Sequence, residues 1–188
     1  MIQTWIILND MLPTEACKSG DDKQICGDCP HRGKSCYVNV GQASQAIYRA
    51  MKRGSYDGLT VDTTNKLVRC GAYGDPAFIP IETWKAILAP TKNNTGYTHQ
   101  WRKCDHEFST FLMASCDNMQ DYTDAKALGY RTFRVRREGE PLLPNEIDCP
   151  AANSDKITCS MCLKCNGTNG SSKKDVSIVI HGIRKNNF

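Results

Sequence analysis

The chain has 188 residues and a formal net charge of +4, from 24 Lys and Arg against 20 Asp and Glu. Its length is ordinary for a single compact domain, and the mild positive charge permits contact with nucleic acid without requiring it. The 11 cysteines are an odd number, which excludes complete pairing within one chain, and 11 in 188 is below the roughly 8–10% of short secreted disulfide scaffolds.

The amino-terminal stretch indicates the compartment. It lacks a basic segment, and its apolar run is interrupted at Asn9 and Asp10, so it is typical of neither a signal peptide nor a membrane span. We therefore expect a cytoplasmic protein that does not contact a membrane. In that reducing compartment, closely spaced cysteines are more often metal ligands or redox groups than disulfides.

The first half of the chain predicts two strands and two helices around a cysteine-rich loop. Residues 2–8 are apolar enough for a first strand, whereas 14–36 are rich in Gly, Asp and Cys and predict a loop. A helix is expected at 42–52. A strand at 67–72 runs into a Gly-Asp-Pro turn, and 80–88 predict a second helix between two prolines. The apolar face of the first helix comprises Ala43, Ala46, Ile47 and Ala50.

The second half continues the alternation. We expect strands at 96–101, 110–114, 130–135 and 176–180, and a helix at 121–128 that is stopped by Gly129 in the left-handed conformation. Strands that alternate with helices imply crossover connections and a largely parallel sheet. The sequence therefore predicts the α/β class.

The sharpest motif is Cys159-x2-Cys162-x2-Cys165. Two-residue spacers let successive thiolates converge on one soft cation, at about 2.3 Å for zinc. A tetrahedral site needs a fourth ligand, and either His181 or Cys149 could supply it. The motif predicts bound metal, either zinc or an iron–sulfur cluster of the [4Fe–4S] type.

A second cysteine group, Cys26-x2-Cys29-x6-Cys36, lies in the loop after the first predicted strand. Three thiolates could bind three irons of a [4Fe–4S] cluster and leave the fourth iron open to a ligand, or they could form a second zinc site. The spacing differs from the Cys-x3-Cys-x2-Cys of the common radical S-adenosylmethionine (SAM) enzymes.

Polar residues follow several predicted strands, where parallel sheets place their sites. Asp75, His99 and Asp117 are the candidate catalytic residues, as nucleophile, general base or general acid. Tyr97 and Asn118 are candidates for binding the substrate. Each has a structural alternative, because Asp75 also suits a turn, His99 a buried structural role and Asn118 a helix cap.

The basic residues of the strand at 130–135 suggest a partner. If this segment is a strand, Arg134 and Arg136 project together from one face. We expect them to bind the phosphates of a nucleic acid, the alternative being an ordinary solvated face.

Short motifs spread over most of the chain resemble a family of phage and plasmid proteins of unknown function. The motifs are Cys26-Gly-Asp-Cys-Pro, Cys36-Tyr37, Gly74-Asp75-Pro76, Tyr97-Thr98-His99, Cys149-Pro-Ala, Thr158-Cys-x2-Cys-x2-Cys165 and His181-Gly182. The resemblance implies a virus-encoded protein in the cytoplasm of the host cell. It does not imply an activity.

Two more distant similarities imply a chemistry. The order of the cysteine cluster and the polar strand ends looks like that of phage proteins with a radical-SAM-type partial barrel. The carboxyl-terminal cysteines with His181 are similar to those of tRNA-guanine transglycosylases and their DNA-directed relatives, whose barrels bind structural zinc through three cysteines and a histidine. Those enzymes use an aspartate nucleophile at a strand end, for which Asp75 or Asp117 is the candidate here.

These observations combine into one expectation. A full barrel takes about 200 residues or more, so we expect a single α/β domain over 1–188 that forms a partial or minimal TIM-like barrel, with a Cys-rich loop at 14–36 and a metal-binding segment at 149–182. The leading hypothesis is a phage-type metalloenzyme that modifies nucleic acid or its bases, with transglycosylase-like chemistry. The alternatives are a radical-SAM-like iron–sulfur enzyme and a non-catalytic, zinc-stapled protein that binds a host protein.

Overall fold

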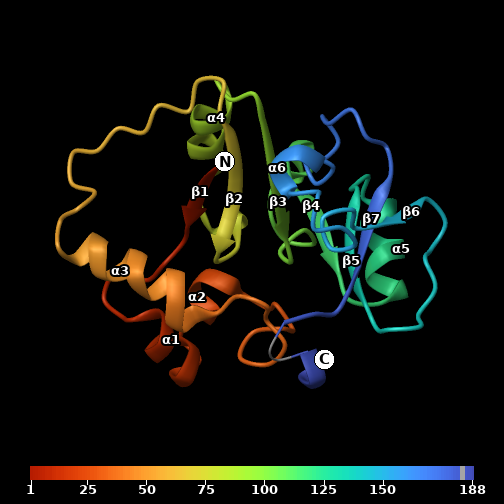
Figure 1. The fold of residues 1–188 in the computed structure, drawn as a ribbon, viewed down its shortest axis with the longest axis horizontal. Coiled ribbons are helices and arrows are strands. Elements are labelled where there is room, and N and C mark those ends of the chain that lie inside the picture. The colour runs from red at the N-terminus through yellow and green to blue at the C-terminus, as the bar shows by residue number, and fades with distance from the viewer. Residues whose placement is uncertain (183–184) are drawn as a thin grey trace.

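The computed structural model describes residues 1–182 and 185–188 (Figure 1). Its seven strands form one all-parallel sheet in the order β1-β2-β3-β4-β5-β7-β6. The strands are β1 (Ile2–Trp5), β2 (Leu67–Tyr73), β3 (Asn93–Thr98), β4 (Met113–Cys116), β5 (Thr132–Arg136), β6 (Glu146–Asp148) and β7 (Asp175–Val179). The α/β class and the parallel sheet are confirmed. The sheet is open, with β1 and β6 at its edges.

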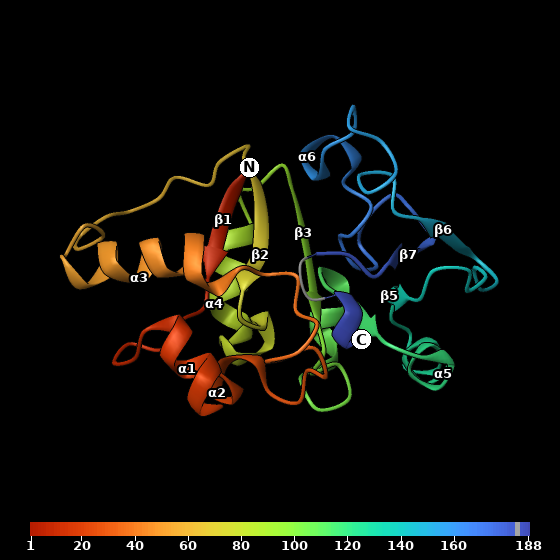
Figure 2. The ribbon, with the colours of Figure 1, turned by 60° about the horizontal axis from the view of Figure 1, so that its bottom comes forward.

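Helices and short turns connect the strands. The α-helices are α1 (Pro13–Ser19), α2 (Lys23–Cys26), α3 (Gln45–Lys52), α4 (Ile81–Leu88), α5 (Met119–Ala127) and α6 (Cys159–Cys162). A π-helical turn, η1 (Val40–Ser44), leads into α3, and short 3-10 turns form η2 (Pro76–Phe78), η3 (His106–Thr110) and η4 (Lys185–Asn187). In both views α1 and α2 lie at the carboxyl end of β1, and α6 lies toward the opposite end of the sheet (Figures 1 and 2).

Some expectations for individual segments are wrong. The segment 14–36 is no plain loop, since it contains α2 and most of α1. The helix at 42–52 forms, but its predicted apolar face is not the buried one: Ala43 and Ala46 are exposed, whereas Gln45 and Tyr48 are buried. Gly129 does adopt the left-handed conformation after α5, with φ of 80°.

The two faces of the sheet have different surroundings, because successive side chains of a strand point to opposite sides. On the helix-covered face, Val68 and Cys70 of β2 belong to one apolar cluster with Trp84 of α4. Ala114 of β4 belongs to a second cluster with Ala125 of α5. The other face borders a cavity, so we call it the cavity face.

Arg134 and Arg136 project from the helix-covered face, as the strand pattern predicts, but neither is at the surface. Arg134 is 1% exposed, and its guanidinium donates to Glu146 through Nε and Nη2, both at 2.8 Å. It also bonds Glu140, and Arg136, 8% exposed, bonds Asp148. Both guanidinium groups are already bonded to acidic residues of the same chain, so we do not assign Arg134 and Arg136 to a nucleic-acid surface.

Candidate active site and metal centres

A cavity of about 610 Å³ opens against the sheet and collects most of the predicted site residues. Strands β2, β3, β5 and β7 contribute side chains to its wall, from Arg69 and Tyr73 through Tyr97 and Phe133 to Ile178. The size is ordinary for a small-molecule site. Cysteines from both predicted groups reach it: Cys26, Cys29 and Cys36 from the amino-terminal segment, and Cys149 and Cys159 from the carboxyl-terminal one.

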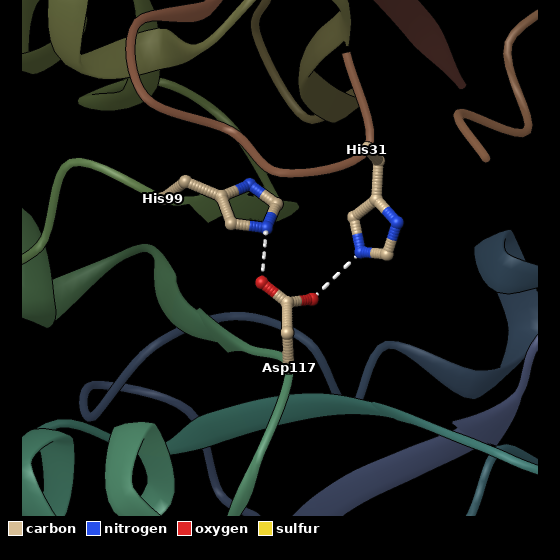
Figure 3. Close-up of side chains that lie close together, drawn as sticks. All are labelled: His31, His99 and Asp117. Atoms are coloured by element: carbon tan, nitrogen blue, oxygen red, sulfur yellow. Dashed lines mark hydrogen bonds and ion pairs between the residues drawn. The ribbon is translucent and has the colours of Figure 1, made fainter. Parts of the chain in front are cut away.

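Two histidines converge on one carboxylate beside this cavity (Figure 3). His31 Nε2 lies 2.6 Å from Oδ1 of Asp117, and His99 Nε2 lies 3.2 Å from Oδ2. Cys29 Sγ is 3.9 Å from His99 Nε2. Both histidines line the cavity, so Asp117 joins two groups that can face a bound ligand.

The loop that carries His31 is fastened at both ends. Arg32 donates to Asp22 at 2.6 Å, which ties the loop to the start of α2. Gln100, just after β3, donates to the carbonyl of Cys26 at 3.3 Å. The loop is therefore fixed on β3, which brings His31 to His99.

Asp75 has a positioning role in this arrangement. It is 7% exposed, and its two carboxylate oxygens accept from the backbone N–H groups of Ala77 at 3.0 Å and His99 at 2.8 Å. The first bond caps η2, and the second links the turn after β2 to the residue that follows β3. Burial raises the pKa of Asp75. The predicted turn residue thus also holds the backbone of His99.

Asp117 and Asn118 follow β4, as expected, but have different roles. Asn118 is the N-cap of α5, where its side chain accepts from the backbone N–H of Asp121 at 2.9 Å. Asp121 in turn accepts from the N–H of Asp117 at 3.1 Å. This is the helix-cap alternative for Asn118, and it fixes the backbone from which Asp117 reaches the histidines.

The electrostatics of the group favour an ionised carboxylate. Burial lowers the pKa of His99, but its contacts with Asp117 and Cys29 outweigh burial and raise the pKa to about 10. Burial raises the pKa of Asp117, but the bonds to His31 and His99 outweigh it and hold the pKa below its usual range. A metal ion would displace the histidine proton, because metal binding needs neutral imidazole.

The donor set fits a divalent metal. Among the described residues, His31, His99 and Asp117 are the one group of three or more histidine, cysteine and acidic side chains whose ligand atoms all lie within 4.8 Å of one another. Ser35 bonds Nδ1 of His31 at 2.7 Å, which is the outer contact that orients a metal-binding imidazole and leaves Nε2 for the ion. Two nitrogens and one oxygen, with the Cys29 sulfur nearby, are donors that zinc accepts.

The carboxyl-terminal cysteines gather around a second, smaller cavity. Its wall includes Cys149, Cys159, Cys162 and Cys165, and its volume is about 20 Å³. Burial, followed by the charges of the other three cysteines, raises the pKa of Cys165 to about 12. Several thiolates cannot ionise together without a cation between them, and a bound metal would reverse this penalty.

The segment that carries these cysteines is held firmly on the sheet. The N–H of Gly96 in β3 donates to the carbonyl of Cys165 at 2.9 Å, and the N–H of Cys149 donates to Ser177 in β7 at 2.7 Å. Arg131, 4% exposed, donates to the carbonyls of Lys164, Gly167 and Lys174 and to the side-chain oxygen of Asn166. Arg131, which was expected to be one of the basic surface residues, thus holds the cysteine loop in place.

Of the two candidate fourth ligands, Cys149 borders the small cavity with the other three cysteines, although no three of these four sulfur atoms all lie within 4.8 Å of one another. His181 lines the large cavity instead, where it stacks on Tyr37 with ring centroids 5.8 Å apart and does not border the small one. Tyr97 lies between the two cavities and contributes to both walls. Its ring packs on Phe133 with centroids 4.3 Å apart.

Sequence reasoning missed two members of the site. His31 sits between two cysteines of the predicted loop, and a histidine in such a segment is a ligand type that could have been weighed with them. Arg69, which lines the cavity from β2, gave no signal, because a single arginine in a strand pattern marks nothing.

Two further findings bear on function. Within the described residues, no helix is both long enough and apolar enough to cross a bilayer. Comparisons of the chain with protein-family models, with curated proteins and with solved structures found no match.

Proposed function

We propose that this protein is a metal-dependent enzyme that modifies a nucleobase, free or presented by a nucleic acid. The observation that carries the proposal is the convergence of His31, His99 and Asp117 beside the large cavity. The similarity to base-exchanging barrels agrees with a nucleobase as the substrate. The open parallel sheet carries polar groups at the carboxyl ends of β3 and β4, where parallel sheets place their sites.

The cavity suits a planar, partly polar ligand. Tyr97 and Phe133 offer a pair of aromatic rings, and Ile178 adds apolar surface. Aromatic rings bind bases of any sequence by stacking. A volume of about 610 Å³ has room for one base with its sugar, but a base in a duplex would have to be flipped out of the stack to enter.

The histidines would supply the chemistry, with a metal ion between them. A zinc ion held there would polarise a substrate oxygen or lower the pKa of a bound water. Ser35 orients His31, and Asp75 fixes the backbone of His99, so both imidazoles are preorganised. All four oxygens of Asp75 and Asp117 already have bonding partners, which favours metal and histidine chemistry over an aspartate nucleophile.

We further propose that Cys149, Cys159, Cys162 and Cys165 bind a structural metal centre, zinc or a [4Fe–4S] cluster. Their common cavity and the raised pKa values of Cys149 and Cys165 support this. A second candidate function, a radical-SAM-like iron–sulfur enzyme, is supported by one observation: the amino-terminal cysteine group follows β1 and lines the same large cavity. Iron and sulfide in anaerobically purified protein would favour it, and zinc alone would favour the first function.

Replacing His31 or His99 with Ala, or Asp117 with Asn, should remove one metal ion per chain and abolish activity. These side chains would supply two nitrogen ligands and one oxygen ligand to the same ion, so loss of any one leaves too few protein ligands. Metal content by elemental analysis measures the effect. The matched control is His106→Ala, because His106 is exposed, and its ring lies outside the group, where it bonds the Leu128 carbonyl and contacts the Tyr130 ring. Equal metal in all four variants would show that the group is only a hydrogen-bonded triad.

Binding to bases tests the substrate class. The wild-type protein should bind guanine, guanosine or single-stranded DNA at low salt, and Tyr97→Ala should weaken that binding by about tenfold or more, since stacking on one aromatic ring contributes about 1–3 kcal/mol. Calorimetric titration with the metal-loaded protein gives the affinities. If none of these ligands binds, a nucleobase substrate is ruled out. The result would then favour the alternative of a non-catalytic protein that binds a host protein.

A further inference from the structure

Among the described residues, Arg69 has no carboxylate partner. Its Nη2 donates to the hydroxyl of Tyr37 at 2.5 Å, and its guanidinium lies 6.0 Å from the centroid of that ring. Its Nε is buried and has no hydrogen-bond partner. None of the ion pairs among the described residues involves Arg69.

Other arginines of the chain show the contrast. Arg32 and Arg136 also leave a buried Nε without a partner, but each pairs with an aspartate through its terminal nitrogens. Arg134 is saturated by Glu146 and Glu140. Arg69 alone combines an unbonded Nε, the absence of a carboxylate partner within the described chain, and a place in the wall of a ligand-sized cavity.

The position of Arg69 suits the far end of a substrate. Arg69 pairs in register with Thr95 on β3, four residues before His99, which corresponds to about 13 Å along a strand at 3.3 Å per residue. Tyr97 lies between them on the same strand and lines the cavity. A ligand that stacks on Tyr97 can therefore reach the histidines with one end and Arg69 with the other.

We propose that Arg69, with Tyr37, binds an anionic group of the substrate, a carboxylate or a phosphate. A guanidinium offers these groups a planar fork of N–H donors, and no carboxylate among the described residues pairs with that of Arg69. The hydroxyl of Tyr37 supplies a further donor at the same place. This inference rests on the proposed function and adds to it that the preferred substrate is an anionic base derivative, such as a nucleotide or a base carboxylate.

Paired probes test the inference. Guanosine 5′-monophosphate against guanosine tests phosphate, and orotate against uracil tests carboxylate. We expect the wild-type protein to bind at least one anionic probe about tenfold or more tightly than its neutral partner, because hydrogen bonds to charged groups contribute about 1.5–3 kcal/mol. Arg69→Gln should abolish this preference while the affinity for the neutral probe stays within about twofold. Arg69→Lys should retain part of it.

Controls separate this role from others. Arg102→Gln removes an arginine that is paired with Asp121 and Asp124 outside the cavity, and it should keep the preference. If Arg69→Gln does not fold, Tyr37→Phe should still reduce the preference for the anion. Metal content is measured in every variant, because Cys159 and Cys165 lie near Arg69 and the guanidinium could serve only as their counter-charge. Loss of cysteine-bound metal with an unchanged anion preference would show that role and overturn the proposal.

The failure of this inference differs from the failure of the proposed function. If neutral and anionic probes bind equally well, the anion site is wrong and the nucleobase site stands. If no probe binds at all, both are wrong. If the preference persists undiminished in Arg69→Gln and Tyr37→Phe, another group binds the anion.

Discussion

Cys162→Ser should release the metal of the four-cysteine group and unfold the segment between β6 and β7. The binding energy of a structural metal is largely folding energy, on the order of 10 kcal/mol or more for zinc, because no preformed site exists in the unfolded chain. The helix of this segment adds little packing, since α6 has four residues, none of them buried. Without the metal, the segment would depend on its hydrogen bonds, among them those from Arg131 and from the backbones of β3 and β7.

Elemental analysis and thermal unfolding of Cys162→Ser measure this effect, with Cys17→Ser as the matched control. Cys17 is a half-buried cysteine of α1 that borders neither cavity, so its variant should keep the metal and the stability of the wild type. Cys149→Ser should behave like Cys162→Ser, and His181→Ala should not. Full metal and unchanged stability in Cys162→Ser would show that Cys162 is not a ligand.

The same measurement counts the centres. Cys29 and Cys162 belong to different cysteine groups, and only the group of Cys29 contacts His99. We expect Cys29→Ser to leave the metal of the four-cysteine group in place. One zinc per chain that is lost equally in both variants would mean a single shared site.

The sequence predicted the sheet well because the relevant signals are local. Alternating strands and helices imply parallel crossovers, and parallel strands bring their carboxyl ends to one edge. That rule placed His99 and Asp117 at neighbouring strand ends, where the structure has them in contact.

The expectations that the structure changed have a different physical origin, because they depend on which residues meet across the fold. Strand alternation put Arg134 and Arg136 on one face, but nothing local shows that Glu146 and Asp148, both in a strand of three residues, would pair with them. Asp75 and Asn118 have polar side chains that suit a site or a cap equally well. Only their bonds to His99 and Asp121 decide between the two.

The buried pair of Arg134 and Glu146 gives the second large prediction, in which Glu146→Gln should destabilise the fold by about 3–5 kcal/mol. The side chains are 1% and 0% exposed, so the substitution replaces the buried carboxylate by an amide and leaves Arg134 with Glu140, which is 41% exposed, as its carboxylate partner. The desolvation of the guanidinium is then only partly offset. Urea unfolding at constant metal loading measures the loss. Glu82→Gln is the control, because Glu82 is 77% exposed and solvent screens its ion pair with Lys85, so the substitution should cost far less stability.

A double variant tests the physical reason. Arg134→Met with Glu146→Leu removes both charges and keeps most of the apolar volume, so it should recover much of the stability that Glu146→Gln loses. Glu140 would then lose an arginine partner, but it is 41% exposed and water can solvate it. If Glu146→Gln costs no more than Glu82→Gln, water reaches Arg134. In that case the guanidinium would again be available to an external phosphate, as the sequence first suggested.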